Sequence, residues 1–175
     1  MKDWPAKHEA VLQKVEETFP EAVEEVVDFR GERTLVVEQK LLKPILLMLR
    51  DEMQFNLLED ICADDYLPDF PRFAVNYSLY SIPRNHRIRL RTWVEDPESG
   101  PDTAADIWPI ATWLEMEVWD LMGVRFKGNQ SLRRLFLPQD WQGHPLRKDY
   151  PLGYEEVQFS FNWKAIDERK PYAKD

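Results

Sequence analysis

Two neighbouring stretches of the chain alternate strictly between apolar and polar residues, and this pattern limits the possible folds more than any other feature. The inward-facing positions are Phe73, Val75, Tyr77 and Leu79 in the first stretch and Ile88, Leu90, Thr92 and Val94 in the second. Alternation with a period of two is typical of strands that bury one face. A short turn around Pro83 joins the stretches, so the sequence predicts a β-hairpin. Its second face would be basic and aromatic, with Arg87, Arg89, Arg91 and Trp93.

Helical spacing and strand-like runs predict the other elements of the N-terminal part. The expected helices run from Asp3 to Phe19, from Leu41 to Met53 and from about Ala105 to Leu121, and the expected strands run from Val23 to Phe29, from Thr34 to Glu38 and from Leu58 to Tyr66. This order predicts an α+β fold, a two-layer sandwich of a mostly antiparallel sheet with helices on one face. We expect residues 1–122 to form this domain and residues 123–175 to form a long, irregular C-terminal tail that docks on partner subunits.

Several kinds of chemistry are disfavoured by what the sequence contains. The single cysteine, Cys62, cannot form an internal disulfide or supply the four ligands of an iron–sulfur cluster, and we expect it to pack as a small apolar residue. His8, His86 and His144 are widely scattered, and the glycine-rich motifs that hold dinucleotides or triphosphates do not occur. We therefore predict no catalytic residues, no metal site and no cofactor bound by this chain.

A membrane span is not expected. The longest apolar run, Pro44 to Leu49, is far shorter than the roughly 20 residues that a spanning helix needs. The N-terminus has no apolar signal-peptide core. We expect a cytoplasmic chain that meets a membrane only indirectly, through its partners.

Charge is distributed unevenly along the chain. The net charge is −9, which disfavours a general nucleic-acid binder, yet the window from Arg125 to Asp149 has six basic and two acidic residues. Arginine beside aromatic residues is typical of protein interfaces. The expected partner-interface residues are Arg125, Arg133, Arg134, Trp141, His144, Arg147, Lys148, Asp149 and Tyr150. Among them, Trp141 is the residue we most expect to insert into a partner.

The stretch from Trp113 to Leu152 carries a specific resemblance. Its first part contains Trp113, Glu115, Glu117, Asp120 and Gly123, and its last part reads GHPLRKDYPL. It resembles the signature of the 30-kDa subunit family (the C subunits) of the proton-pumping NADH:quinone oxidoreductases, respiratory complex I. Similarity continues upstream, so the resemblance covers about residues 61–152.

The resemblance implies a structural and assembly subunit in the hydrophilic arm of a translocase. The complex passes electrons from NADH through FMN and iron–sulfur clusters to quinone and couples this transfer to proton translocation. Those cofactors would lie in partner subunits. The implied partners are the quinone-site subunit, which is related to hydrogenase large subunits, and the subunit with the terminal iron–sulfur cluster. The implied location is peripheral, on the cytoplasmic side of the bacterial cell membrane.

Three residues depart from the family pattern: Met116 stands where arginine is usual, Met122 where phenylalanine is usual, and Asn129 where histidine is usual.

One alternative to a complex I subunit is a same-family subunit of a membrane-bound hydrogenase or a ferredoxin-linked oxidoreductase. A remote alternative is a nucleic-acid adaptor that uses the basic hairpin face and the tail. The acids Glu115, Glu117 and Asp120 could do acid–base work, but we expect them to pair with the basic tail or with a partner.

Overall fold

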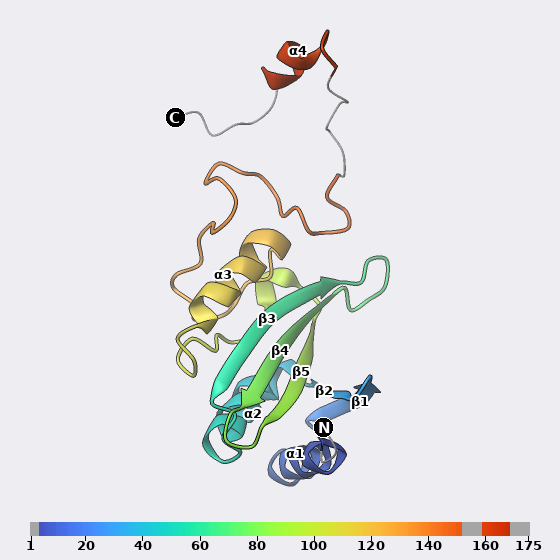
Figure 1. Cartoon of the computed structure of the whole chain (residues 1–175), viewed down its shortest axis with the longest axis vertical. Helices are drawn as coiled ribbons and strands as arrows, with labels where there is room; N and C mark the ends of the chain where they lie inside the picture. The colour runs from blue at the N-terminus through green and yellow to red at the C-terminus, as the bar shows by residue number, and fades with distance from the viewer. Residues whose placement is uncertain (1–3, 152–158, 169–175) are drawn as a thin grey trace.

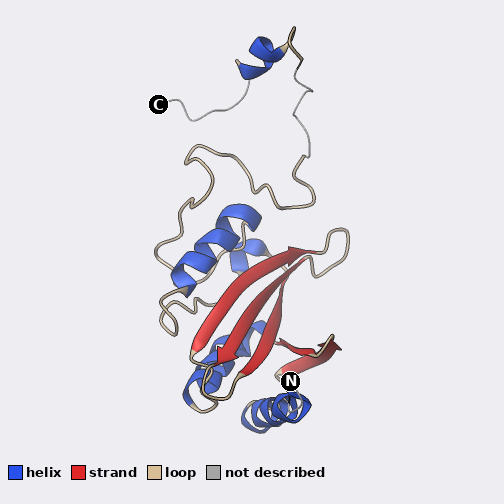
Figure 2. Ribbon diagram, in the orientation of Figure 1, coloured by secondary structure: helices blue, strands red, loops and turns tan. Residues whose placement is uncertain are grey.

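The computed structural model describes residues 4–151 and 159–168. A single five-stranded sheet is bordered by helices (Figures 1 and 2). The elements are α1 (Trp4–Thr18), β1 (Val23–Phe29), β2 (Glu32–Val37), α2 (Gln39–Asp51), β3 (Leu57–Asp65), β4 (Phe73–Ser81), β5 (His86–Val94), the short 3-10 helix η1 (Pro97–Ser99), α3 (Ala111–Met122) and α4 (Trp163–Asp167). The predicted α+β class and the predicted strands are confirmed.

The strand order is β1-β2-β5-β4-β3. Three of the four neighbouring pairs are antiparallel, and the exception is the pair β2–β5, whose strands run parallel with Leu35 opposite Leu90. The sheet is therefore mostly antiparallel, as expected. The parallel pair joins two hairpins into one sheet, and α2 lies in the connection between them.

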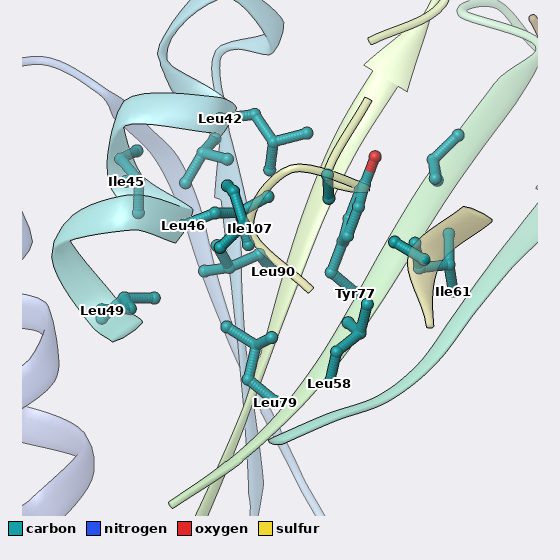
Figure 3. Packing of buried hydrophobic residues seen from close by; sticks show 14 of the residues in the cluster. Leu42, Ile45, Leu46, Leu49, Leu58, Ile61, Tyr77, Leu79, Leu90 and Ile107 are labelled. Atoms are coloured by element: carbon teal, nitrogen blue, oxygen red, sulfur yellow. The ribbon is translucent and has the colours of Figure 1, made fainter. Parts of the chain in front are cut away.

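The core lies between the sheet and the helices. Helix α2 turns its apolar residues toward the predicted inward side of the β4–β5 hairpin (Figure 3). Leu46 and Leu49 of α2 are completely buried, as are Tyr77, Leu79 and Leu90 of the sheet. Burial of large apolar side chains supplies the main stabilisation of such a layer, about 1.5–3 kcal/mol for each. The predicted apolar face of the hairpin is confirmed.

The opposite face of the sheet is charged, but it carries no surplus of free cations on β5. Arg87 pairs with Glu59 at 3.0 Å and Arg89 pairs with Glu32 at 3.2 Å. Arg91 donates to Asn76 at 2.8 Å and lies 3.7 Å from Asp64. Acids of β2 and β3 thus compensate the arginines, which removes the main physical basis for nucleic-acid binding by this face.

The expectation for Cys62 was wrong. Its position on β3 pairs with Asn76 of β4, and the Cys62 residue is exposed on this polar face rather than packed in the core. Strand alternation explains the error, because Ile61 is the position of β3 that turns inward.

The last predicted helix begins later than expected, at Ala111 instead of Ala105. Residues 105–110 form turns, because Pro109 disfavours the helical conformation of the residue before it. Ile110, expected on the buried side, is 49% exposed. Helix α3 instead buries two acids, Glu115 and Asp120.

Candidate interface on helix α3 and the C-terminal strap

Residues 124–151, which we call the strap, leave α3 and run back along the domain without regular secondary structure (Figure 1, yellow to orange). The turn into the strap depends on Gly123, which has a φ of 76° and ends the helix in the left-handed conformation. A side chain at this position would collide with Arg147 and His144. Glycine is therefore required both for the turn and for the close approach of the strap.

Asp120 is the centre of the contact between helix and strap. Its carboxylate is completely buried and accepts the backbone N–H groups of Leu135, Phe136 and Leu137 at 2.9, 2.8 and 3.0 Å. Burial alone would raise the pKa of the Asp120 carboxyl, but these hydrogen bonds together with that of Arg134 hold it below its usual range. Asp120 is thus an ionised group that binds a loop of its own chain.

Arg134 completes this arrangement from the strap side. Its guanidinium donates to the Asp120 carboxylate at 3.0 Å and to the Asp120 carbonyl at 2.9 Å. It also donates to the carbonyls of Trp141 and Gly143 at 2.9 and 3.0 Å and lies over the Trp119 ring at 5.4 Å. One arginine therefore holds two distant parts of the strap against the end of α3.

His144 and Arg147 contact the carbonyls that the helix end leaves free. His144 Nδ1 lies 2.9 Å from the Asp120 carbonyl, and Arg147 Nε donates to the Met122 carbonyl at 2.7 Å. Burial, partly offset by the hydrogen bond to Asp120, lowers the pKa of His144. Both side chains cap the C-terminal end of α3, and the positive charge of Arg147 is favoured there by the helix dipole.

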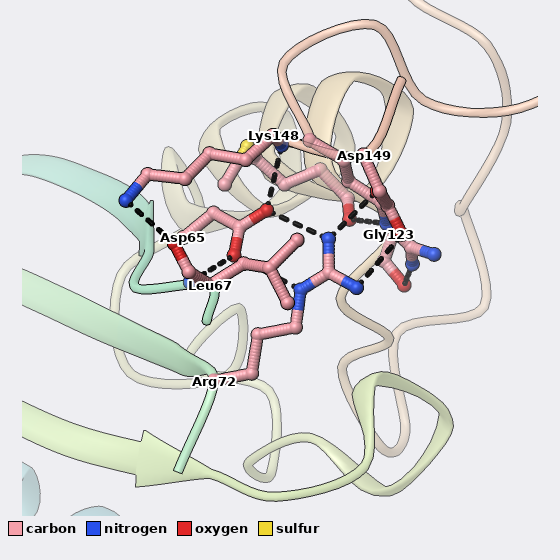
Figure 4. Close-up of polar contacts among 8 residues, drawn as sticks. Asp65, Leu67, Arg72, Gly123, Lys148 and Asp149 are labelled. Atoms are coloured by element: carbon pink, nitrogen blue, oxygen red, sulfur yellow. Dashed lines mark hydrogen bonds and ion pairs between the residues drawn. The ribbon is translucent and has the colours of Figure 1, made fainter. Parts of the chain in front are cut away.

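A second cluster joins the end of the strap to the sheet (Figure 4). Arg72 binds the Asp65 carboxylate with two hydrogen bonds of 2.9 and 2.8 Å and the Asp149 carboxylate with two of 2.9 and 2.7 Å. The backbone N–H of Lys148 also donates to Asp65, and Lys148 Nζ donates to the Leu67 carbonyl at 3.0 Å. The Arg72 guanidinium holds the pKa of the Asp65 carboxyl well below its usual range.

Glu115 connects α3 to the beginning of the strap. Its buried carboxylate accepts hydrogen bonds from Thr103 Oγ1, the Ala104 N–H and Asn129 Nδ2, at 2.7, 2.7 and 2.9 Å. Burial raises the pKa of Glu115, although these hydrogen bonds oppose the rise. Asn129, which departs from the family pattern, thus still supplies an N–H donor to this acid.

The other two departures, Met122 and Met116, are both buried. Met122 is a member of the buried core, where a phenylalanine side chain would also be apolar. Met116 is 2% exposed and lines a groove together with the strap residue Leu132. No acid is among the described residues that line this groove, so an arginine at position 116 would find no carboxylate there.

The remaining predicted interface and signature residues lie outside the contacts of Asp120, Arg72 and Glu115. Arg125 is exposed and 3.6 Å from Glu98, and Arg133 is exposed with no ion pair to the residues that the structure describes. Trp141 and Tyr150 are partly buried and border the same shallow pocket. Trp113 is 51% exposed, and Glu117 is half-buried. Contact of any of these residues with a partner stays a prediction.

Sequence reasoning missed Asp65 and Arg72 as site residues. Both stand in stretches that carry the family resemblance, but they lie 77 or more residues from their strap partners. A local pattern cannot show such a pairing.

Within residues 4–151 and 159–168, no group of three or more histidine, cysteine, aspartate or glutamate side chains could hold a metal ion. Nor does any helix of that described part have the length and apolarity to cross a membrane.

Comparison with known proteins identifies the relatives of this chain. The family model described as "Respiratory-chain NADH dehydrogenase, 30 Kd subunit" matches residues 35–156. The chain belongs to this family. The match spans the sheet from β2 onward, helix α3 and the whole strap, so it includes both buried acids and the Arg72 cluster.

Members of the 30 Kd subunit family align along most of the chain. The C subunit of the NADH-quinone oxidoreductase of Geotalea uraniireducens is 44% identical over 152 residues, which is 87% of this chain and 92% of the relative. The protein of the same name from Roseiflexus sp. is 40% identical over 167 residues, covering 94% and 96% of the two chains. The chain is thus a complex I subunit of the 30 Kd type.

Two solved structures resemble the fold. The first, described as Nqo5 of the trypsin-resistant fragment (1-134), has a TM-score of 0.61 and 33% identity and covers 70% of this chain and 96% of its own. The second is a chain of an archaeal membrane-bound sulfane sulfur reductase, with a TM-score of 0.71, 22% identity and coverage of 97% and 96%. The second likeness shows the fold alone.

Proposed function

We propose that this complex I subunit is non-catalytic and acts by holding neighbouring subunits of the hydrophilic arm in place. The observation that carries the proposal is the role of the two buried signature acids. Glu115 and Asp120 are buried and use their hydrogen-bonding capacity on the chain's own backbone and strap. Such acids stabilise a shaped surface and have no free position for acid–base work.

The proposed partners are the quinone-site subunit and the subunit with the terminal iron–sulfur cluster. FMN, the iron–sulfur clusters and quinone would be bound by partner subunits. The exposed Arg133, which has no ion pair to the described residues, supports contact with an acidic partner surface. The proposed location is peripheral on the cytoplasmic side of the bacterial cell membrane, with contact to the membrane through partners only.

We also propose the division into a domain of residues 1–122 and a tail that docks on partners. The related Nqo5 fragment supports it, since a fragment described as trypsin-resistant corresponds to 70% of this chain. Val124 and Phe126 nevertheless reach into the buried core, so the first residues of the strap pack with the domain.

Purification of the complex from native membranes, through an affinity tag on this chain, tests the proposal. We expect the quinone-site and terminal-cluster subunits to co-purify, together with NADH oxidation activity. A complex that contains hydrogenase or ferredoxin-linked subunits, and that does not oxidise NADH, would support the same-family alternative. Recovery of the tagged chain without other respiratory subunits would contradict the assembly role.

A further inference from the structure

A groove lies between the first half of α3 and the strap, apart from the Asp120 and Arg72 clusters. Its volume is about 490 Å³. The lining residues are Pro109, Thr112, Trp113 and Met116 on the helix side and Gln130, Ser131, Leu132 and Arg133 on the strap side. In the described part of the chain, the side chains that line the groove make no hydrogen bond or ion pair that holds the strap on the domain. They are therefore available for contact with another protein.

The walls of the groove are fixed before any partner binds. On one side of residues 130–133, Asn129 donates to the buried Glu115 carboxylate at 2.9 Å. On the other side, Arg134 and the N–H groups of residues 135–137 bind the buried Asp120 carboxylate. Helix α3 supplies both acids. A binding surface held at both ends in this way loses little conformational entropy when it is occupied.

The lining of the groove combines apolar residues, small polar residues and one uncompensated cation. Met116 is buried, and the Trp113 side of the groove is half open to solvent, with Trp113 51% exposed and Ile110, three residues earlier, 49% exposed. Arg133 is exposed and has no hydrogen bond or ion pair to the described residues. A half-exposed tryptophan beside a free arginine has the composition of an interface hot spot.

We propose that this groove docks a segment of a partner subunit in which an apolar side chain stands next to a carboxylate. The apolar side chain would lie against Met116 and Trp113, and the carboxylate would pair with Arg133 at the rim. The reverse arrangement, a carboxylate beside Met116, would bury a charge against methionine without a counter-ion, which is strongly unfavourable. The inference rests on the proposed assembly role and specifies the chemistry of one contact.

Charge reversal at the rim tests the carboxylate part. In the tagged complex from native membranes, we expect Arg133→Glu to lower the yield of one co-purifying subunit about tenfold. Lys127→Glu is the matched control, because Lys127 is exposed on the same strap outside the groove and makes only backbone hydrogen bonds. It should change the yield less than about twofold. Equal effects of the two variants would overturn the groove proposal.

A photo-crosslinker at the half-exposed position, Trp113→p-benzoylphenylalanine, tests the apolar part in the assembled complex. We expect the cross-linked peptide to come from another subunit and to contain an apolar residue beside Asp or Glu. A cross-link to a second copy of this chain, to its own residues 159–168, or to a peptide without a carboxylate would overturn the proposal. If the unmodified tagged chain brings down no respiratory subunit, the assembly role itself fails, which is a distinguishable result.

Discussion

The carboxylate of Asp120 shows how a single residue can organise a segment that has no regular structure. Three successive N–H groups and one guanidinium converge on it. An irregular segment must satisfy its backbone groups without a helix or sheet, and here one side chain does so for three residues. The second buried signature acid, Glu115, has the same type of role at the opposite end of the groove.

Replacement of Asp120 should therefore be strongly destabilising. We expect Asp120→Asn to lower the free energy of unfolding by about 2–4 kcal/mol, because the amide cannot accept as many N–H groups and leaves Arg134 without its counter-charge. Urea denaturation followed by fluorescence would measure the change. Glu117→Gln is the control on the same helix, since the half-buried Glu117 has no side-chain hydrogen bond or ion pair in the described part of the chain. An equal loss in the control would contradict the assigned role.

Tyr77, unlike Asp120, buries a polar group without a hydrogen-bond partner among the described residues. Its ring is completely buried, and its hydroxyl has no hydrogen-bond partner among the described residues (Figure 3). Burial raises the pKa of Tyr77, so the hydroxyl stays neutral. We expect Tyr77→Phe to leave stability unchanged or to increase it by up to about 1 kcal/mol, since a buried hydroxyl without a partner is unfavourable. Thermal unfolding measures this, and a clear loss of stability would show that the hydroxyl has a partner.

At the scale of elements, a buried histidine pair joins α1 to β5. His86 Nε2 lies 3.0 Å from His8 Nδ1, and the Gly31 carbonyl lies 3.4 Å from His8 Nε2. Burial lowers the pKa of His8 and lowers the pKa of His86 to about 4. The charged groups around the pair are Lys7, Asp28, Arg33 and Arg84. Both imidazoles are therefore neutral in the folded protein at neutral pH.

This pair should make stability depend on pH in the mildly acidic range. The folded pKa values lie below the unfolded value of about 6.5, so the unfolded chain binds protons first and stability falls as pH falls from about 6.5 toward 4. We expect His86→Gln to make this loss smaller by about 1–3 kcal/mol. Unfolding measured in urea at several pH values tests it, and identical pH profiles for variant and wild type would contradict it.

The end of the strap should open more readily when its outer acid is neutralised. Asp149 is half-exposed and binds Arg72, so Asp149→Asn weakens the strap end while the Asp65–Arg72 pair remains. We expect trypsin to cleave after Arg147 and Lys148 about threefold faster, in keeping with the modest strength of an exposed ion pair. Asp140→Asn, exposed on the same strap, is the control. Equal cleavage rates would mean that Asp149 does not hold the strap.

Local pattern predicted the elements well and their long-range pairing poorly. The hairpin of β4 and β5 follows from alternation, and the helical spacing that ends near Leu121 predicted the end of α3 to within one residue. The parallel pairing of β2 with β5 has no local signal, because it depends on which apolar faces can share α2. The contacts of Asp65 and Arg72 with the strap are equally distant in sequence. The start of the last helix was predicted six residues too early because the apolar residues continue with helical spacing before Pro109, and this spacing was given more weight than the proline.

At the scale of the whole molecule, the described part is one sheet with helices against it and a strap laid across one end (Figure 1). Several arginines of the described part are compensated internally: those of β5 face acids of β2 and β3, and Arg134 and Arg72 bind acids of the domain. Exposed large apolar side chains occur on the strap and at the start of α3, with Phe136, Leu146 and Trp113, and also elsewhere on the domain, with Phe29 and Phe70. What sets the strap and α3 apart is that their buried acids fix the backbone of this part of the surface.

The isolated full-length chain should also lack any redox property of the complex. We expect no visible absorption and no NADH oxidation after purification, because the sequence has a single cysteine and no glycine-rich nucleotide motif. Absorption spectroscopy and a standard NADH assay check this. A chromophore that stays with the chain through gel filtration would contradict the cofactor-free assignment.

The Arg72 cluster also affects the order in which parts of the protein can fold while the ribosome synthesises the chain. Asp149 leaves the ribosome 77 residues after Arg72. Until then, the Asp65–Arg72 pair can form and the Asp120 carboxylate is present, but the strap residues that bind these groups have not all been made. The nascent domain can therefore assemble its sheet first, and the surface that partners would meet is finished only with the last part of the chain. A chain released early would present a folded sheet but no completed docking surface.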